Sequence, residues 1–95
     1  MKIDFRKIKC RNIEGDVQEL DISKTLGNRI YSETGDLGEL DLAQRIYRLG
    51  EVELAEEDVK TVRKYLKQGF KAFIQKGFEH SLKDGEEMED ENNKE

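Results

Sequence analysis

The first part of the chain alternates between polar and apolar residues, as a strand with one buried face does. Four apolar residues carry the alternation and fall into two phases: Ile3 with Phe5, then Ile8 with Cys10. The pattern predicts a strand over residues 2–13 with a bulge or bend near Arg6–Lys7, where the phase changes. Residues 14–16 read Glu-Gly-Asp, a turn sequence, and residues 17–22 resume the strand pattern. We therefore expect an N-terminal β-hairpin, which must pack on another element because a two-stranded hairpin alone is marginally stable.

A first helix is predicted directly after this hairpin. Asp21 or Ser23 can cap its start, and the helical pattern continues to about Ser32. Two apolar residues one turn apart form its buried face, Leu26 and Ile30. The sequence Thr-Gly-Asp at 34–36 interrupts the pattern, since glycine suits the left-handed residue that ends helices.

A second helix is predicted from the capping pair Asp36 and Glu39 to Gly50. Its apolar residues recur at helical spacing: Leu37, Leu40, Ala43, Ile46 and Tyr47. The short connection between the two helices predicts an αα-hairpin. Residues 51–54 alternate again, which favours a short third strand.

The last predicted element is one long helix over residues 56–76. Three acidic residues, Glu56, Glu57 and Asp58, favour a helix start because they face the positive end of the helix dipole. Six apolar residues then fall within one stripe roughly 120° wide: Val59, Val62, Leu66, Phe70, Phe73 and Ile74. The stripe continues across Gly69, so we expect no break there. Phe78 and Leu82 fall outside the stripe, which predicts a kink or an end at Gly77.

These elements predict an α+β fold. It consists of an N-terminal β-hairpin, an αα-hairpin, a short third strand and a long C-terminal helix packed on the sheet. Nine residues are expected in the core: Leu26, Ile30, Leu40, Ile46, Val59, Val62, Leu66, Phe70 and Phe73.

Charge divides the chain into two unequal parts. The whole chain has a net charge of −5, and residues 1–82 contain equal numbers of basic and acidic residues. The acidity therefore belongs to residues 83–95, where Met88 is the only apolar residue. Such a segment buries too little surface to offset its ordering entropy. We expect one small domain over 1–82 and a disordered acidic tail over 83–95, which either aids solubility or shields a basic surface of the domain.

Composition excludes most catalytic and metal-binding classes. The chain has one histidine, His80, and one cysteine, Cys10, too few for a zinc site of the usual kind. It contains neither of the glycine-rich motifs that bind phosphates or dinucleotides, and no apolar run of membrane-spanning length. We expect no enzyme activity, no catalytic residue, no cofactor, no metal, no small-molecule substrate and no membrane partner. A single cysteine fits a reducing compartment, so a cytoplasmic location is expected.

A repeated motif is the first candidate for function. Residues 26–31 read LGNRIY and residues 42–47 read LAQRIY. In one interpretation the repeat specifies how two helices pack, with Leu and Ile buried and a small residue beneath each tyrosine. In the other, the repeat presents a partner surface, since Tyr and Arg are enriched at interaction hot spots. That candidate partner surface is Arg29, Tyr31, Arg45 and Tyr47.

A basic stripe is the second candidate, and it consists of Lys60, Lys64, Lys67 and Lys71. These lysines cluster within about 60° of the predicted helix. They form either a solvated flank whose stems cover the core edge, or a nucleic-acid footprint. Docking of a recognition helix is excluded, because its N-terminal residues would be Glu56, Glu57 and Asp58, three carboxylates facing a polyanion.

Three segments carry a resemblance to known proteins: DISKTLGNRIY (21–31), GDLGELDLAQRIY (35–47) and GEVEL (50–54). With them, residues 1–76 resemble small uncharacterised proteins of bacteriophage and prophage gene clusters. The resemblance defines no catalytic or binding residue. It implies a non-catalytic protein-interaction module of phage or mobile-element origin, in particle assembly, whose partner is a second copy or a phage or host protein. The alternative is a nucleic-acid-associated accessory protein that uses the basic stripe, with the acidic tail as competitor.

Overall fold

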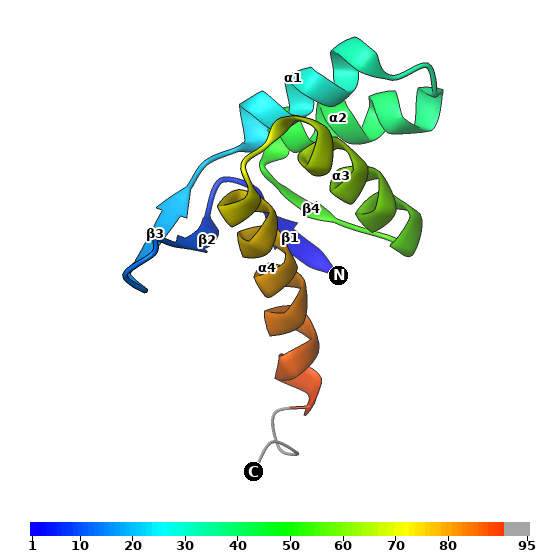
Figure 1. The fold of residues 1–95 in the computed structure, drawn as a ribbon. Helices are drawn as coiled ribbons and strands as arrows, with labels where there is room; N and C mark the ends of the chain where they lie inside the picture. Colours follow the sequence, from blue (N-terminus) through cyan, green and yellow to red (C-terminus); the bar gives the residue numbers. More distant parts are fainter. Residues whose placement is uncertain (91–95) are drawn as a thin grey trace.

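The computed structural model describes residues 1–90, with the side chains through Lys83. Within this range the chain forms short strands and longer helices (Figure 1). In chain order they are β1 (Lys2–Asp4), β2 (Ile8–Arg11), β3 (Val17–Leu20), α1 (Ser23–Glu33), α2 (Leu37–Leu49), β4 (Glu51–Glu53), α3 (Glu56–Gly69) and α4 (Ala72–Asp90). The predicted class, an α+β fold with N-terminal strands followed by helices, is confirmed.

The strands form two separate antiparallel pairs. β2 pairs with β3, which confirms the predicted hairpin and its turn at 14–16. β1 pairs with β4, so the short third strand predicted over 51–54 exists and joins the first residues of the chain. Ile3 stands opposite Val52 in this pair. The prediction of one strand over 2–13 is wrong, because its two halves belong to different sheets.

A tight turn causes the phase change near Arg6–Lys7. The amide of Lys7 donates to the Asp4 carbonyl (3.1 Å), and the Arg6 guanidinium donates to both oxygens of the Asp4 carboxylate (2.9 and 3.1 Å). The bonds from the Arg6 side chain are the main reason that the pKa of Asp4 is lowered. The turn redirects the chain so that all four alternating apolar residues remain buried: Ile3, Phe5, Ile8 and Cys10.

The αα-hairpin of α1 and α2 is confirmed, with boundaries close to those predicted. Asp36 caps α2 by accepting a hydrogen bond from the amide of Gly38 (3.1 Å). Glu39 does not complete a capping box, because its carboxylate accepts from the Thr34 hydroxyl instead (2.7 Å). Gly50 ends α2 with a positive φ of 77°.

The prediction of a single helix over 56–76 is wrong, because the helix is interrupted between α3 and α4. Phe70 has extended backbone angles (φ −121°, ψ 152°) and terminates α3. Its carbonyl accepts a hydrogen bond from the Gln75 side chain in the first turn of α4 (2.9 Å). α4 then packs on β2, and Gly77 lies inside this helix rather than at its end. The long helix on the sheet is thus α4, which begins at Ala72.

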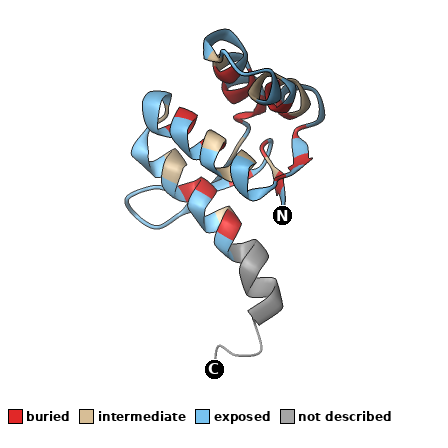
Figure 2. Cartoon of the chain, turned by 90° about the vertical axis from the view of Figure 1, so that its right-hand side faces the viewer, coloured by how far each residue is buried: buried red, intermediate tan, exposed pale blue. Residues whose placement is uncertain are grey.

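The core lies where α4, the strands and the other helices meet, as the buried positions in Figure 2 show. Phe5 and Phe78 are both fully buried, and their rings stack with centroids 5.9 Å apart. Of the predicted core residues, five are buried: Leu26, Ile30, Ile46, Val62 and Leu66. Three are half-buried, Leu40, Val59 and Phe70, and the last two pack against the core. The prediction for Phe73 is wrong because the break at Phe70 turns it outward, and the same break brings Phe78 and Leu82 into the core.

The predicted acidic tail falls on the end of α4 and on residues 91–95. Residues 91–95 lie outside the described residues, and so do the side chains of 84–90. The disorder expected over 83–95 therefore stays a prediction.

Candidate binding surfaces

The repeated motif builds the contact between α1 and α2. Its four aliphatic residues are buried: Leu26, Ile30, Leu42 and Ile46. Gly27 allows the close approach, because a Cβ added there would stand 2.9 Å from the Tyr47 Cβ and 3.0 Å from the Ala43 carbonyl oxygen. The packing interpretation is therefore confirmed for the aliphatic and small positions of the repeat.

The small, amide and tyrosine positions of the repeat line a groove of about 240 Å³ between the two helices. Its lining consists of Gly27, Asn28, Tyr31, Ala43, Gln44, Tyr47 and Arg48. The first six are three pairs of equivalent positions in the two copies of the motif. Tyr31 is 51% exposed and Tyr47 is 41% exposed, so both rings present a face to solvent. We call this the tyrosine groove.

The two arginines of the predicted partner surface lie elsewhere. Arg29 pairs with Glu33 (3.0 Å) and lies over the end of α3, because a Cβ added to Gly69 would fall 2.2 Å from the Arg29 Nε. Arg45 pairs with Asp41 one turn earlier on α2 (3.0 Å). The structure thus brings the two tyrosines together and separates them from both arginines.

Arg48 is the cation of the tyrosine groove, and sequence reasoning missed it. It follows Tyr47 in the chain and lies one helical turn after Gln44, another lining residue. The i,i+4 spacing from Gln44 could have predicted that Arg48 lies on the same face of the helix.

Tyr65 shows what a structural tyrosine looks like in this fold. It is 4% exposed, and its hydroxyl donates to the Glu39 carboxylate (3.1 Å). Within the described residues, neither the Tyr31 nor the Tyr47 hydroxyl has a hydrogen-bond partner. The Lys24 ammonium lies over the Tyr47 ring, 5.1 Å from its centroid. Both groove tyrosines therefore keep unused polar and apolar surface.

The basic stripe is not one continuous helical surface. Lys60 and Lys67 are exposed on α3, whereas Lys71 lies in the link between α3 and α4. Lys64 pairs with Glu39 (3.3 Å) and lies 4.8 Å above the Tyr65 ring. One of the four predicted lysines is thus engaged in joining α2 to α3.

Glu39 is the centre of that junction. Its carboxylate accepts hydrogen bonds from Thr34, Tyr65 and Lys64. These bonds lower the pKa of Glu39, chiefly through the Thr34 hydroxyl and further through Tyr65 and Lys64, and they outweigh the burial that would raise it. Glu39 is therefore a structural anion and not a free acid or base.

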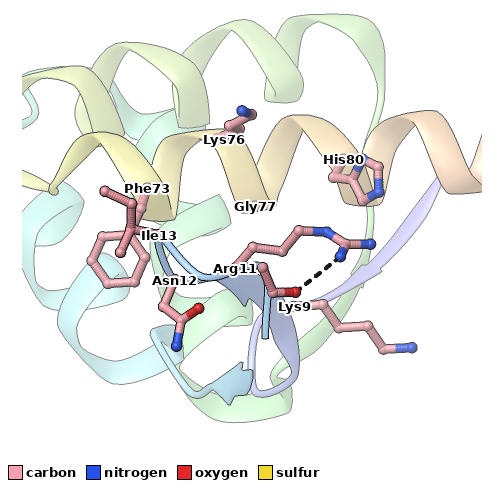
Figure 3. Close-up of a pocket in the computed structure, with 9 residues that line it drawn as sticks. Lys9, Arg11, Asn12, Ile13, Phe73, Lys76, Gly77 and His80 are labelled. Carbon is pink, nitrogen blue, oxygen red and sulfur yellow. Dashed lines mark hydrogen bonds between the residues drawn. The ribbon is translucent and has the colours of Figure 1, made fainter. Parts of the chain in front are cut away.

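A third surface is the groove of about 330 Å³ between the β2–β3 hairpin and α4 (Figure 3). Its lining consists of Lys9, Arg11, Asn12, Ile13, Gly15, Phe73, Lys76, Gly77 and His80. Figure 3 shows Ile13 and Phe73 at one end and Lys9, Arg11 and His80 towards the other. Sequence reasoning missed this site, because it placed Phe73 in the core. We call it the hairpin groove.

The environment of Cys10 does not favour a catalytic role for its thiol. The thiol is buried, and burial raises its pKa, which disfavours the thiolate that a nucleophile requires. Among the described side chains, no group of three or more His, Cys, Asp or Glu residues could hold a metal ion. None of the described helices is both long and apolar enough to cross a membrane.

Compared with known proteins, the chain matches no family model, no curated protein and no solved structure. The likeness of residues 1–76 to bacteriophage and prophage proteins therefore stays a prediction from the sequence. The candidate surfaces rest on the geometry described above.

Proposed function

We propose that this chain is a small non-catalytic protein-interaction module that binds its partner through the tyrosine groove. The observation that carries the proposal is the pair of exposed tyrosines, Tyr31 and Tyr47, at equivalent positions of the repeat. Tyrosine offers a large, rigid ring and a hydroxyl at low entropic cost, which suits it to binding hot spots.

The polar lining supports a protein partner. Asn28 and Gln44 can donate to and accept from a peptide backbone, and Arg48 adds one positive charge. The groove lining contains no acidic residue. A partner segment that combines an apolar side chain with a carboxylate would fit this chemistry.

The origin in a phage or mobile element and a role in particle assembly rest on the sequence resemblance of residues 1–76. The partner is a second copy of this chain or a phage or host protein, and the location is cytoplasmic. All of these belong to the proposal.

The test replaces both tyrosines in the full chain. Tyr31→Ala with Tyr47→Ala keeps each Cβ, and the Tyr47 Cβ is the atom nearest to Gly27, so the helix contact is retained. Sedimentation velocity measures self-association, and affinity capture from cells that carry the gene identifies another partner. We expect the double variant to keep its helical circular dichroism and its melting transition while losing the partner.

Two matched variants sharpen this test. Leu37→Ala removes an apolar side chain that is 81% exposed and does not line the tyrosine groove, so it should leave binding unchanged. Tyr31→Phe with Tyr47→Phe separates the contribution of the hydroxyls from that of the rings. A strictly monomeric chain without a partner would contradict the proposal, and so would a double Ala variant that binds normally.

A nucleic-acid-associated role is the second candidate, with the acidic tail competing for the same surface. The favouring observation is that residues 59–78 contain no acidic residue and six basic ones: Lys60, Arg63, Lys64, Lys67, Lys71 and Lys76. Salt-dependent binding of an oligonucleotide that falls in a Lys60→Gln, Lys67→Gln variant would support this role for the basic stripe.

A further inference from the structure

We propose that the hairpin groove binds a segment of single-stranded nucleic acid. Lys9 and Arg11 would contact phosphates, and Phe73 would stack against a base. This site uses elements other than those of the tyrosine groove, so it does not depend on the proposed protein partner.

The charge of the groove favours an anionic ligand. Its lining includes three basic residues, Lys9, Arg11 and Lys76, and no acidic one. Residues 1–82 as a whole are neutral, so this concentration of positive charge is local. Within the described residues, neither Lys9 nor Lys76 has an ion-pair partner, whereas Arg63 nearby is paired with Glu79.

The positive surface extends from the hairpin groove across α4. Lys76 also lines a second groove, between α3 and α4, together with Lys67, Arg63 and the Glu79 that pairs with Arg63. Figure 3 shows the Lys76 side chain on the side of α4 away from Arg11. A chain of phosphates longer than the hairpin groove would therefore meet further cations beyond it.

The apolar end of the groove favours an anion that also carries a flat ring, such as a nucleic-acid base. Phe73 is 39% exposed, and Ile13 has no protection from solvent. Both lie at the same end of the groove (Figure 3). Proteins that hold single strands combine cations along the backbone with aromatic rings on which bases stack. An acidic peptide would pair with the basic residues, but it has no base to stack on the exposed Phe73 ring.

Hydrogen bonds within the hairpin fix one wall of the groove. The Asn12 side chain accepts from the amides of Glu14 and Asp16 (3.0 and 2.9 Å), which fixes the hairpin turn. Arg11 donates to the Gly15 carbonyl (3.2 Å), and this bond orients the guanidinium along the groove (Figure 3). A site held in place before binding loses less entropy when the ligand binds.

A single strand fits this geometry better than a duplex. The walls of the groove are one hairpin and one helix. Exposed bases are needed for stacking on Phe73, and a duplex hides the faces of its bases.

The experiment measures anisotropy of a fluorescent oligo-dT with the full chain, starting at about 20 mM salt and raising the salt. We expect binding whose logarithm falls linearly with the logarithm of the salt concentration. Lys9→Gln with Arg11→Gln should weaken binding and reduce that slope by about 1.4, or about 0.7 for each lost phosphate contact. Phe73→Ala should weaken binding roughly tenfold, with the slope unchanged.

Matched controls separate this site from the others. Lys2→Gln removes one positive charge on β1, away from the groove lining, and should leave the affinity almost unchanged. Lys60→Gln with Lys67→Gln removes two charges from the basic stripe. Circular dichroism of each variant confirms that it is folded.

Four results would overturn the proposal. The first is the absence of binding at low salt. The second is loss of binding in the stripe variant but not in the Lys9 and Arg11 variant. The third is equal affinity for the duplex of the same strand. The fourth is equal affinity for polyglutamate with no effect of Phe73→Ala, which would make the groove a general polyanion site.

Discussion

Gly77 of α4 lies directly against Cys10 of β2. A Cβ added to Gly77 would stand 2.8 Å from the Cys10 Sγ and 2.8 Å from the backbone oxygen of Lys9. Because one of these neighbours is backbone, a side chain at this position would push the helix away from the strand. The contact brings α4 close to the hairpin and places Gly77 in the lining of the hairpin groove.

Gly77→Ala should therefore destabilise the protein, by about 1–3 kcal/mol, the usual cost of overpacking a core. Urea unfolding followed by circular dichroism measures the difference. Gly35→Ala is the matched control, because nothing lies within 4 Å of an added Cβ there. The control should change the free energy of unfolding by less than about 0.5 kcal/mol. Equal stability of the two variants would show that α4 does not approach β2 this closely.

Two glycines of the αα-hairpin should respond to alanine with opposite signs. Gly27→Ala should cost about 1–3 kcal/mol, because its Cβ would meet Tyr47 and the Ala43 carbonyl of α2. Gly38→Ala, in the first turn of α2, meets only the flexible Asp36 side chain, at 3.7 Å. Alanine has the higher helix propensity, so this variant should gain up to about 1 kcal/mol. Thermal melting of both variants gives the two signs, and a destabilised Gly38→Ala would contradict the second.

Local pattern was sufficient for the β2–β3 hairpin, for the short strand β4 and for the first two helices. The change of phase between Phe5 and Ile8 correctly indicated an irregularity, because both apolar pairs had to face one core. It did not reveal that β1 would pair with β4, since that contact joins residues about fifty positions apart. Pairing of distant segments depends on the whole fold and leaves no mark in a local pattern.

The error at Phe70 has a definite physical origin. The apolar stripe of α3 continues in phase across the break, and a periodicity cannot report an interruption that preserves its phase. Gly69 was the only local signal. Once Phe70 is extended, α4 presents a new face to the core, which buries Phe78 and exposes Phe73. The hairpin groove could not be predicted for this reason, because it requires Phe73 to lie beside Ile13.

The tyrosine groove was predicted in part. When two helices pack antiparallel, the end of one copy of the motif faces the start of the other. Tyr47 accordingly lies against Gly27, and Tyr31 and Tyr47 line one groove. The arginines are two positions before each tyrosine, about 200° around a helix, and therefore lie on other faces. Spacing alone could have separated them from the tyrosines.

The Glu39 junction predicts how stability depends on pH. Its pKa is lowered from 4.5 in the folded chain, so the folded state binds a proton less readily than the unfolded state. The stability that ionised Glu39 contributes is therefore complete at pH values above its unfolded-state pKa. It is lost as the pH falls through the pKa of Glu39 in the folded chain. Glu39→Gln should be less stable than the wild type at neutral pH, by about 1 kcal/mol.

This difference should shrink as the pH falls from about 5 towards 3, because the wild type then loses the same charge. Urea unfolding of both proteins across this range measures it. Comparing the two chains removes the contributions of Asp4, Asp21 and Glu53, whose pKa values are also lowered. A difference that stays constant with pH would mean that the Glu39 charge does not act through these bonds.

The acidic tail should compete with nucleic acid for the positive surface of the domain. Glu86→Gln, Glu87→Gln and Glu89→Gln together change the net charge from −5 to −2. At about 20 mM salt this variant should bind the oligonucleotide several-fold more tightly, and the gain should vanish near 0.3 M, where charges are screened over about 6 Å. The matched control removes three acidic charges from the domain, with Glu51→Gln, Glu56→Gln and Glu57→Gln, all exposed residues. If both variants gain equally, net charge alone controls the affinity and the tail has no special access to the groove. A gain confined to the tail variant would establish competition, because only the location of the removed charges differs between the two proteins.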